Sequence, residues 1–154
     1  AIIAPRPAEQ YLFVLPGDVS ENGYYFPIRP LMVSDQPALT SNFYEAQAYA
    51  AEQGGRLPSR AEWQRAYAVE PAATVTTYPE WTRDIAAGEA DENGLPTFGN
   101  DLFIVSVASD QDGNVLLPAL DQTARYYAPG QQLGFRCVLP IDTSTNTMRA
   151  LLGQ

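Results

Sequence analysis

The stretch "DQDGN" places two carboxylates and one amide oxygen at alternate positions beside a glycine. Asp110, Asp112 and Asn114 supply the kind of oxygen ligand that a hard cation such as Ca²⁺ prefers. The stretch is much shorter than an EF-hand loop, and an Asp-Gly pair is equally typical of a tight hairpin turn. The sequence therefore predicts either a calcium site or a turn, and the segment 90–101 offers further oxygen ligands for such a site. No other cofactor is expected.

A second group of residues combines aromatic, cationic and amide side chains in the last third of the chain. Tyr and Arg provide a large contact area with few rotatable bonds, and both are enriched at the energetic centres of binding surfaces. We expect two loop regions, 86–101 and 121–132, to carry recognition. The alternative is that the two tyrosines are strand residues, one packing inward and one outward. The predicted ligand-binding residues are Arg125, Tyr126, Tyr127, Gln131 and Gln132.

The chain lacks residue types on which much enzyme chemistry depends. It has no His, and all 9 of its cationic side chains are Arg. A Ser-His-Asp triad, a His-ligated metal, a Schiff-base lysine and a P-loop lysine are therefore excluded from this chain. Cys137 is the single cysteine among 154 residues, which excludes an intrachain disulfide.

Charge and hydropathy narrow the possible partners. The net charge is -9, whereas nucleic acids and anionic membranes attract basic surfaces, so neither is an expected partner. No apolar run approaches the length of a transmembrane helix, so no membrane insertion is expected. A hydrophobic content of 45% with 18% charged residues is that of a globular domain.

Two helices are predicted in the first half of the chain. Asn42 and Glu45 have the spacing of a capping box, and Gly54-Gly55 ends the helix that follows. Ser59 and Glu62 form a second capping box, which predicts the start of the next helix. The predicted buried stripes are Phe43, Ala46 and Ala50 in the first helix, and Trp63, Ala66 and Tyr67 in the second.

Short strands and loops follow the helices, an order typical of the α+β class. The strongest predicted strand lies at 101–109, and the last lies at 133–140. We expect one domain over 31–140. An extended arm with strands precedes it over 1–30, and a polar tail follows it over 141–154.

Three sequence pieces occur in a characteristic order. They are "NFYEAQAYAAEQGGRLPSRAEWQRA" (42–66), "EWTRD" (80–84) and "GFRCVLP" (134–140). Together they resemble the formylglycine-generating enzyme (sulfatase-modifying factor) family. The resemblance implies a variant of the C-type lectin-like fold, with two early helices packed on short, twisted antiparallel sheets.

The chain departs from that family at its cysteines. The resemblance implies a disulfide between the first helix and "GFRC", but the helix position corresponds here to Ala50, so Cys137 is expected to be a small buried hydrophobe. The family also carries a copper-binding catalytic cysteine pair shortly before "GFRC". The corresponding segment 120–132 contains no cysteine, and soft thiolates are the ligands that select Cu(I). We therefore expect a catalytically inactive member, not an enzyme.

Two kinds of motif residue have both a structural and a functional interpretation. The tryptophans are predicted to anchor the core between the second helix and the sheet, with a ligand-stacking surface as the alternative. The motif arginines are predicted to form structural salt bridges, with binding of an acidic ligand as the alternative. The tryptophans are Trp63 and Trp81, and the arginines are Arg56, Arg83 and Arg136. The candidate ion-pair partners of the arginines are Glu62, Glu80 and Asp84.

These features together predict a non-catalytic recognition or assembly domain that binds a saccharide or a protein through its loops. By analogy with other uses of the fold, a phage tail-fibre tip, a capsid decoration protein or another extracellular surface component is favoured. Arm and tail could contact neighbouring subunits in a homo-oligomer or a virion. The alternative is a formylglycine-generating type of oxidase with an altered active site.

Overall fold

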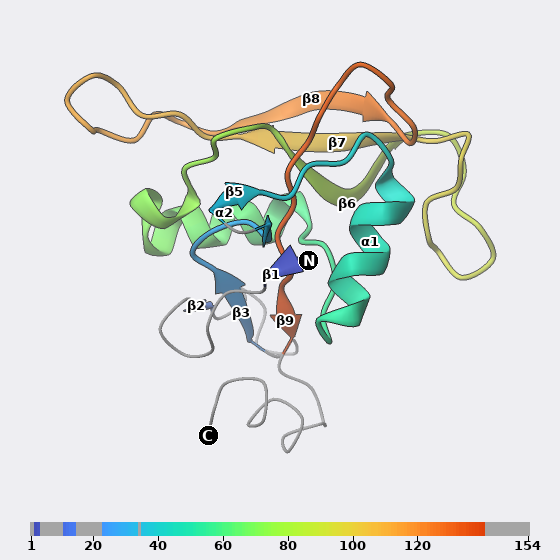
Figure 1. The fold of residues 1–154 in the computed structure, drawn as a ribbon, viewed down its shortest axis with the longest axis horizontal. Helices are drawn as coiled ribbons and strands as arrows, with labels where there is room; N and C mark the ends of the chain where they lie inside the picture. Colours follow the sequence, from blue (N-terminus) through green and yellow to red (C-terminus); the bar gives the residue numbers. More distant parts are fainter. Residues whose placement is uncertain (1, 4–10, 15–22, 34, 141–154) are drawn as a thin grey trace.

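The computed structural model describes residues 2–3, 11–14, 23–33 and 35–140 (Figure 1). The predicted tail over 141–154 and most of the predicted arm lie outside the described residues. Two α-helices sit among short strands, which confirms the α+β class. The elements are β1 (Ile2–Ile3), β2 (Tyr11–Val14), β3 (Tyr24–Pro27), β4 (Met32–Val33), β5 (Gln36–Pro37), α1 (Phe43–Glu52), α2 (Arg60–Val69), the 3-10 helix η1 (Pro71–Thr74), β6 (Glu80–Ala87), β7 (Asp101–Ser106), β8 (Ala119–Arg125) and β9 (Leu139–Pro140).

The strands form three small antiparallel sheets, with the orders β1-β4-β5, β2-β3-β9 and β6-β7-β8. The β6-β7-β8 sheet has the longest strands, and β8 lies at its edge. A hairpin between β7 and β8 and a loop between β6 and β7 project from opposite ends of this sheet (Figure 1). The pairing of β6 with β7 is interrupted between Trp81 and Ile85.

Both predicted helix starts are present. The Asn42 side chain accepts a hydrogen bond from the Tyr44 amide and caps α1, and Ser59 and Glu62 form a complete capping box for α2. The capping box also predicts a bond from the Asn42 amide to the Glu45 side chain. Instead, the Glu45 carboxylate accepts a hydrogen bond from the Thr40 hydroxyl. Neither helix of the described part has the length and apolar composition that crossing a bilayer requires.

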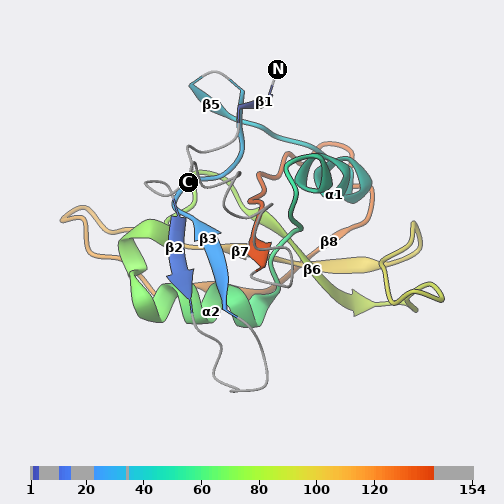
Figure 2. The same cartoon turned by 90° about the horizontal axis from the view of Figure 1, so that it is seen from below.

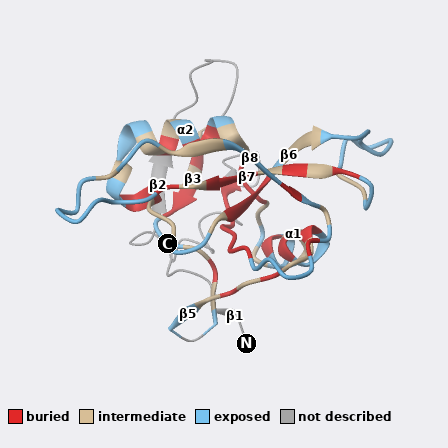
Figure 3. Ribbon diagram, turned by 90° about the horizontal axis from the view of Figure 1, so that it is seen from above, coloured by how far each residue is buried: buried red, intermediate tan, exposed pale blue. Residues whose placement is uncertain are grey.

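The helices lie on opposite sides of the β6-β7-β8 sheet, and buried residues fill the space between (Figure 3). On the α1 side, Phe43 meets Trp81 edge to face with ring centroids 5.8 Å apart. On the α2 side, Trp63 meets Phe26 of β3 at 4.9 Å. Both tryptophans are almost completely buried, which confirms their predicted core role. Only Trp63 lies between α2 and the sheet as predicted, because Trp81 packs on the α1 side. Figure 2 shows β2 and β3 running beside α2, so these two strands lie on the α2 side of the domain.

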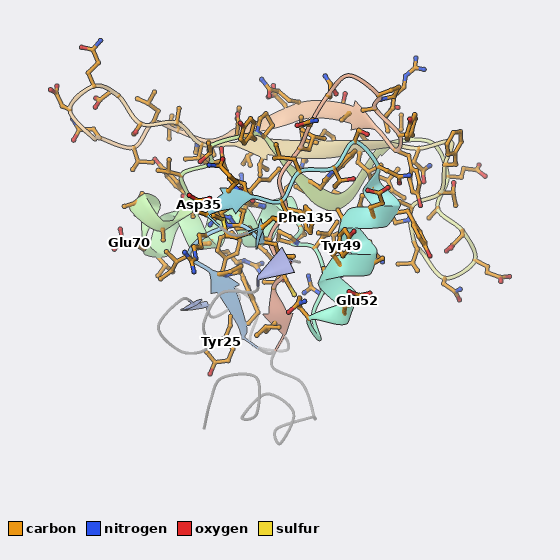
Figure 4. All side chains as sticks on the ribbon, viewed as in Figure 1. Tyr25, Asp35, Tyr49, Glu52, Glu70 and Phe135 are labelled. Atoms are coloured by element: carbon orange, nitrogen blue, oxygen red, sulfur yellow. The ribbon has the colours of Figure 1, made fainter. Side chains whose placement is uncertain are left out.

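The predicted last strand over 133–140 is shortened to β9. Its residues are extended, but their backbone partners change along the segment: Leu133 pairs with Thr40, and the Gly134 carbonyl accepts from Trp81. Phe135 accepts from the Leu31 amide, and its ring stacks on Tyr49 of α1 (Figure 4). Because no single neighbour supplies a continuous ladder, the segment links several elements instead of belonging to one sheet.

Arg136 is fully buried at the centre of this segment and forms an ion pair with Glu80, with Nε and Oε1 3.0 Å apart. Its side chain also stacks over the Trp63 ring, with Cζ 4.9 Å from the centroid. A buried guanidinium needs a counter-charge and acceptors for its N–H groups. Nη1 and Nη2 reach the carbonyl oxygens of Pro27, Ile28, Ala73 and Val75 at 2.8–3.0 Å.

Replacing Glu80 by Gln tests how much the fold depends on this ion pair. The substitution leaves the Arg136 charge buried without its counter-charge, so we expect the free energy of unfolding to fall by about 3 kcal/mol. Urea unfolding of both proteins measures the difference. Glu52→Gln, at the exposed end of α1, is the control and should change stability by less than about 0.5 kcal/mol. A similarly small effect of Glu80→Gln would show that the pair is not required.

Candidate functional site

A groove runs along β8 at the end of the sheet where the loop between β6 and β7 joins β7. It has a volume of about 1000 Å³ and is open to solvent. A second hollow of about 570 Å³ shares Thr123 and Gln131 with it, so the two adjoin. We call the larger hollow the β8 groove. Residues 98–101, 123–125, 127–129 and Gln131 line it.

The chain after β8 forms one wall of the groove. It rises beyond β8 and then turns back through the middle of the molecule (Figure 1). Its path is fixed by backbone hydrogen bonds: Tyr126 accepts from Phe43 at 2.8 Å, and Ala128 donates to Ser41 at 2.7 Å. The wall is therefore attached to the start of α1.

Aromatic side chains at the groove differ in orientation. Phe98 is 75% exposed and Tyr127 is 46% exposed, and both line the groove. Tyr126 packs inward instead, with its ring 5.4 Å from Phe43 and 6.1 Å from Phe98. Partial burial raises the pKa of Tyr126, and the nearby Tyr44 adds to that shift. One tyrosine thus packs inward and the other outward, as in the alternative interpretation, but neither belongs to a named strand, since β8 ends at Arg125.

Charged and amide side chains line the groove. Asp101 and Arg125 face each other across β7 and β8 in the sheet register, and both line the groove. Within the part of the chain that the structure describes, Arg125 forms no salt bridge. Gln131 lines both hollows.

The strand β8, which contributes to the groove, is also an edge strand. β8 pairs with β7 on one side, and no other named strand of the described residues pairs with its second side. Asp121, Gln122 and Thr123 are exposed there. An unpaired strand edge presents a row of backbone donors and acceptors on which another extended chain can pair.

The predicted ligand-binding residues are partly brought together. Arg125, Tyr127 and Gln131 line the β8 groove, Gln132 lines the second hollow with Gln131, and Tyr126 lines neither. The region 121–132 was predicted as a loop, but its first five residues belong to β8. Sequence reasoning did not single out Phe98, although it lies in the predicted loop region 86–101.

The stretch Asp110–Asn114 forms the tight turn of the hairpin between β7 and β8. One Asp110 carboxylate oxygen accepts from the backbone amides of Asp112 and Asn114, each at 2.9 Å. These hydrogen bonds, that from Asn114 first, lower the pKa of Asp110. Gly113 has a φ of +83°, as the turn requires. The hairpin turn is confirmed, and calcium binding by Asp110, Asp112 and Asn114 stays a prediction.

The motif arginines differ in their partners. Arg56 binds Glu62 through two hydrogen bonds of 2.7 and 2.8 Å. Burial alone would raise the pKa of Glu62, but the Arg56 guanidinium and the Ser59 capping bonds lower it. Arg136 is paired as described above. The predicted structural salt bridge of Arg83 is not formed among the described residues, because Asp84 accepts from the α2 amide of Arg60 at 2.8 Å.

Cys137 is buried, as predicted, and its sulfur lies 3.3 Å from the Ala50 carbonyl oxygen. Ala50, where the resemblance implies a cysteine, is thus its direct neighbour. Gly55 also touches this site, since a Cβ there would lie 2.6 Å from the Cys137 sulfur. Burial raises the pKa of the Cys137 thiol to about 12.

The residues at the β8 groove do not fit a copper ion. Cu(I) is selected by soft thiolate ligands, and the one cysteine lies in the core beside Ala50. Across the described residues, no three His, Cys, Asp or Glu side chains come together as a metal cluster. No step of a copper-dependent reaction can therefore be assigned to these side chains.

Comparison with known proteins supports the resemblance found in the sequence. Residues 28–101 match the family described as the sulfatase-modifying factor enzyme 1-like domain. The match supports the resemblance to the formylglycine-generating enzyme family over that part of the chain, and the fold is α+β and C-type lectin-like. It ends at Asp101, before β8 and the wall of the groove. No curated protein and no solved structure gives a significant match.

The environment of Cys137 predicts an unreactive thiol. The thiolate is the nucleophile, and a pKa of about 12 leaves the group protonated at pH 8, so Ellman's reagent should react more than about a hundredfold faster after urea unfolding. Gln111→Cys adds an exposed thiol at the hairpin tip and should react rapidly in the folded protein. If Cys137 reacted at similar rates in the folded and unfolded chains, the buried, protonated thiol would be contradicted.

Proposed function

We propose that this protein is a non-catalytic recognition domain that binds an extended segment of a partner protein in the β8 groove. The observation that carries this proposal is that a strand whose second edge pairs with no named strand of the described residues also lines a groove with exposed aromatic side chains. Phe98 and Tyr127 supply the aromatic surface, and Arg125 supplies a charge without a salt-bridge partner in the described chain.

The chemistry of such a groove suits an extended chain. A segment that lies along β8 adds a strand to the sheet, so that main-chain hydrogen bonds provide affinity. Side chains of the segment then alternate between the groove and the solvent. Tyr127 and Phe98 offer apolar contacts, and Asp101 and Arg125 offer charges of opposite sign for selecting the ligand.

The absence of catalysis is part of the proposal. The resemblance places the family's catalytic cysteines in the segment 120–132, which here forms β8 and the groove wall without a cysteine. Oxygen-dependent oxidation of a cysteine-containing peptide by this protein would instead support an oxidase with an altered site.

A saccharide is the second ligand class that the groove could accept. Exposed aromatic faces and the amide of Gln131 are suitable for sugar rings and hydroxyl groups. The open edge of β8 favours the protein segment, because a saccharide would leave its backbone groups unused. Presentation on a virion or another extracellular surface, alone or as an oligomer, is proposed by fold-level analogy only.

Selection from a phage-displayed random peptide library tests the proposal. We expect enriched peptides to bind the wild-type protein and to lose at least about tenfold in affinity against Tyr127→Ala, because an exposed aromatic anchor is removed. Tyr78→Ala is the matched control, since Tyr78 is 41% exposed outside the groove. N-methylation at alternate peptide amides should weaken binding for one of the two alternations only.

Two results would contradict this function. If no peptide depends on Tyr127 while a glycan array gives Tyr127-dependent ligands, the ligand is a saccharide. If neither library gives a ligand that depends on Tyr127, recognition through the β8 groove is wrong.

A further inference from the structure

The strand β6 contains an irregularity at which the regular pairing with β7 is interrupted and the side chains of Arg83 and Asp84 are redirected. Trp81 pairs with Ile104 and Ile85 pairs with Leu102, so four steps on β6 match two steps on β7. Within the irregularity, the Arg83 amide donates to the Pro58 carbonyl at 2.9 Å instead of to β7. Such bulges re-aim side chains and are common beside functional sites.

The two redirected residues have different environments. Asp84 turns to the start of α2 and is held by Arg60. The Arg83 side chain makes no hydrogen bond or salt bridge with any residue that the structure describes. Arg56 and Arg136, the other motif arginines, are neutralised by glutamates. Arg83 therefore keeps an uncompensated positive charge in a chain of net charge -9.

Arg83 lines a small cavity of about 110 Å³ between α1, β6 and the loop that joins β6 to β7. That volume corresponds to roughly three or four water molecules, so it suits a group of a few heavy atoms. Leu57, Leu95 and Pro96 form apolar walls. The polar groups are Arg56, Gln47 and Arg83, of which Arg56 is already bound to Glu62.

The loop that closes the cavity is organised by its own hydrogen bonds. The Asp91 carboxylate accepts from the amides of Asn93 and Leu95 at 2.8 and 2.9 Å, and the Asp91 carbonyl accepts from Gly94 at 3.0 Å. These amides are used within the loop. The donors left for a ligand are therefore the side chains of Arg83 and Gln47.

We propose that this cavity binds a carboxylate group, carried by a small organic acid or by an acidic side chain of a peptide. The planar guanidinium of Arg83 matches a carboxylate through two parallel hydrogen bonds, and the Gln47 amide can donate a third. The apolar walls fit the carbon next to the carboxylate. The site is separate from the β8 groove, which the same loop reaches through 98–100, and it does not depend on the function proposed above.

Titration of the protein with sodium acetate, followed by NMR, tests the site. Sodium chloride at equal ionic strength is the reference. We expect saturable shifts of the Gln47 side-chain amide and of the Gly94 and Leu95 backbone amides. Arg83→Gln should weaken acetate binding by at least about tenfold, because a charged hydrogen-bonding partner is lost. Arg29→Gln removes the same charge at an exposed position outside the cavity and should leave binding unchanged.

Parallel titrations distinguish the two sources of the carboxylate. A capped glutamate peptide and its glutamine counterpart replace acetate. Saturation by acetate alone indicates a small organic acid, and saturation by the glutamate but not the glutamine peptide indicates an acidic side chain. The proposal is overturned if neither acid gives saturable shifts, or if a well-folded Arg83→Gln variant binds as strongly as the wild-type protein.

Discussion

The burial of Arg136 is the constraint on which the rest of this structure depends. A guanidinium with no exposed surface is tolerated only when its charge is balanced and its N–H groups find acceptors. Glu80 supplies the charge, and carbonyl groups after β3 and around η1 supply acceptors. One side chain thereby fixes three regions that are distant in the sequence: the end of β3, the segment after α2 and the start of β6. The segment 133–140 can then run through the centre without being a regular strand, because its partners on every side are already held.

This internal framework separates the parts of the molecule that are fixed from the parts that are free to bind. The core aromatics, the paired arginines Arg56 and Arg136, and the buried Cys137 are all occupied by packing, ion pairs or backbone contacts. Side chains without an ion pair among the described residues, such as Arg83 and Arg125, lie where the loop between β6 and β7 meets α1 and β8. The β8 groove and the Arg83 cavity lie on different parts of that loop. Binding there would leave the framework unchanged, which is consistent with recognition by a preformed surface.

Local signals in the sequence predicted much of the framework. Capping residues at Asn42 and Ser59 act within one turn, and the apolar stripes around Phe43 and Trp63 have helical spacing, so both helices could be placed. The site was harder to predict, because its features depend on distant parts of the chain. β8 lies at a sheet edge and carries the polar residues Asp121, Gln122 and Thr123, so its sequence pattern resembles that of a loop. The free charge of Arg83 could not be foreseen either, because Asp84 is taken by Arg60 only through the irregularity in β6.

The central claim is that the outer edge of β8 is open and ready to pair. Amide hydrogen exchange of the free protein, measured by NMR residue by residue across 119–125, tests this most directly. The account predicts alternation: amides that point to β7 are protected, and those that point to the outer edge exchange nearly as fast as an unfolded chain. Uniform protection of all β8 amides would contradict the account, because the edge would then already be covered and could not receive a ligand.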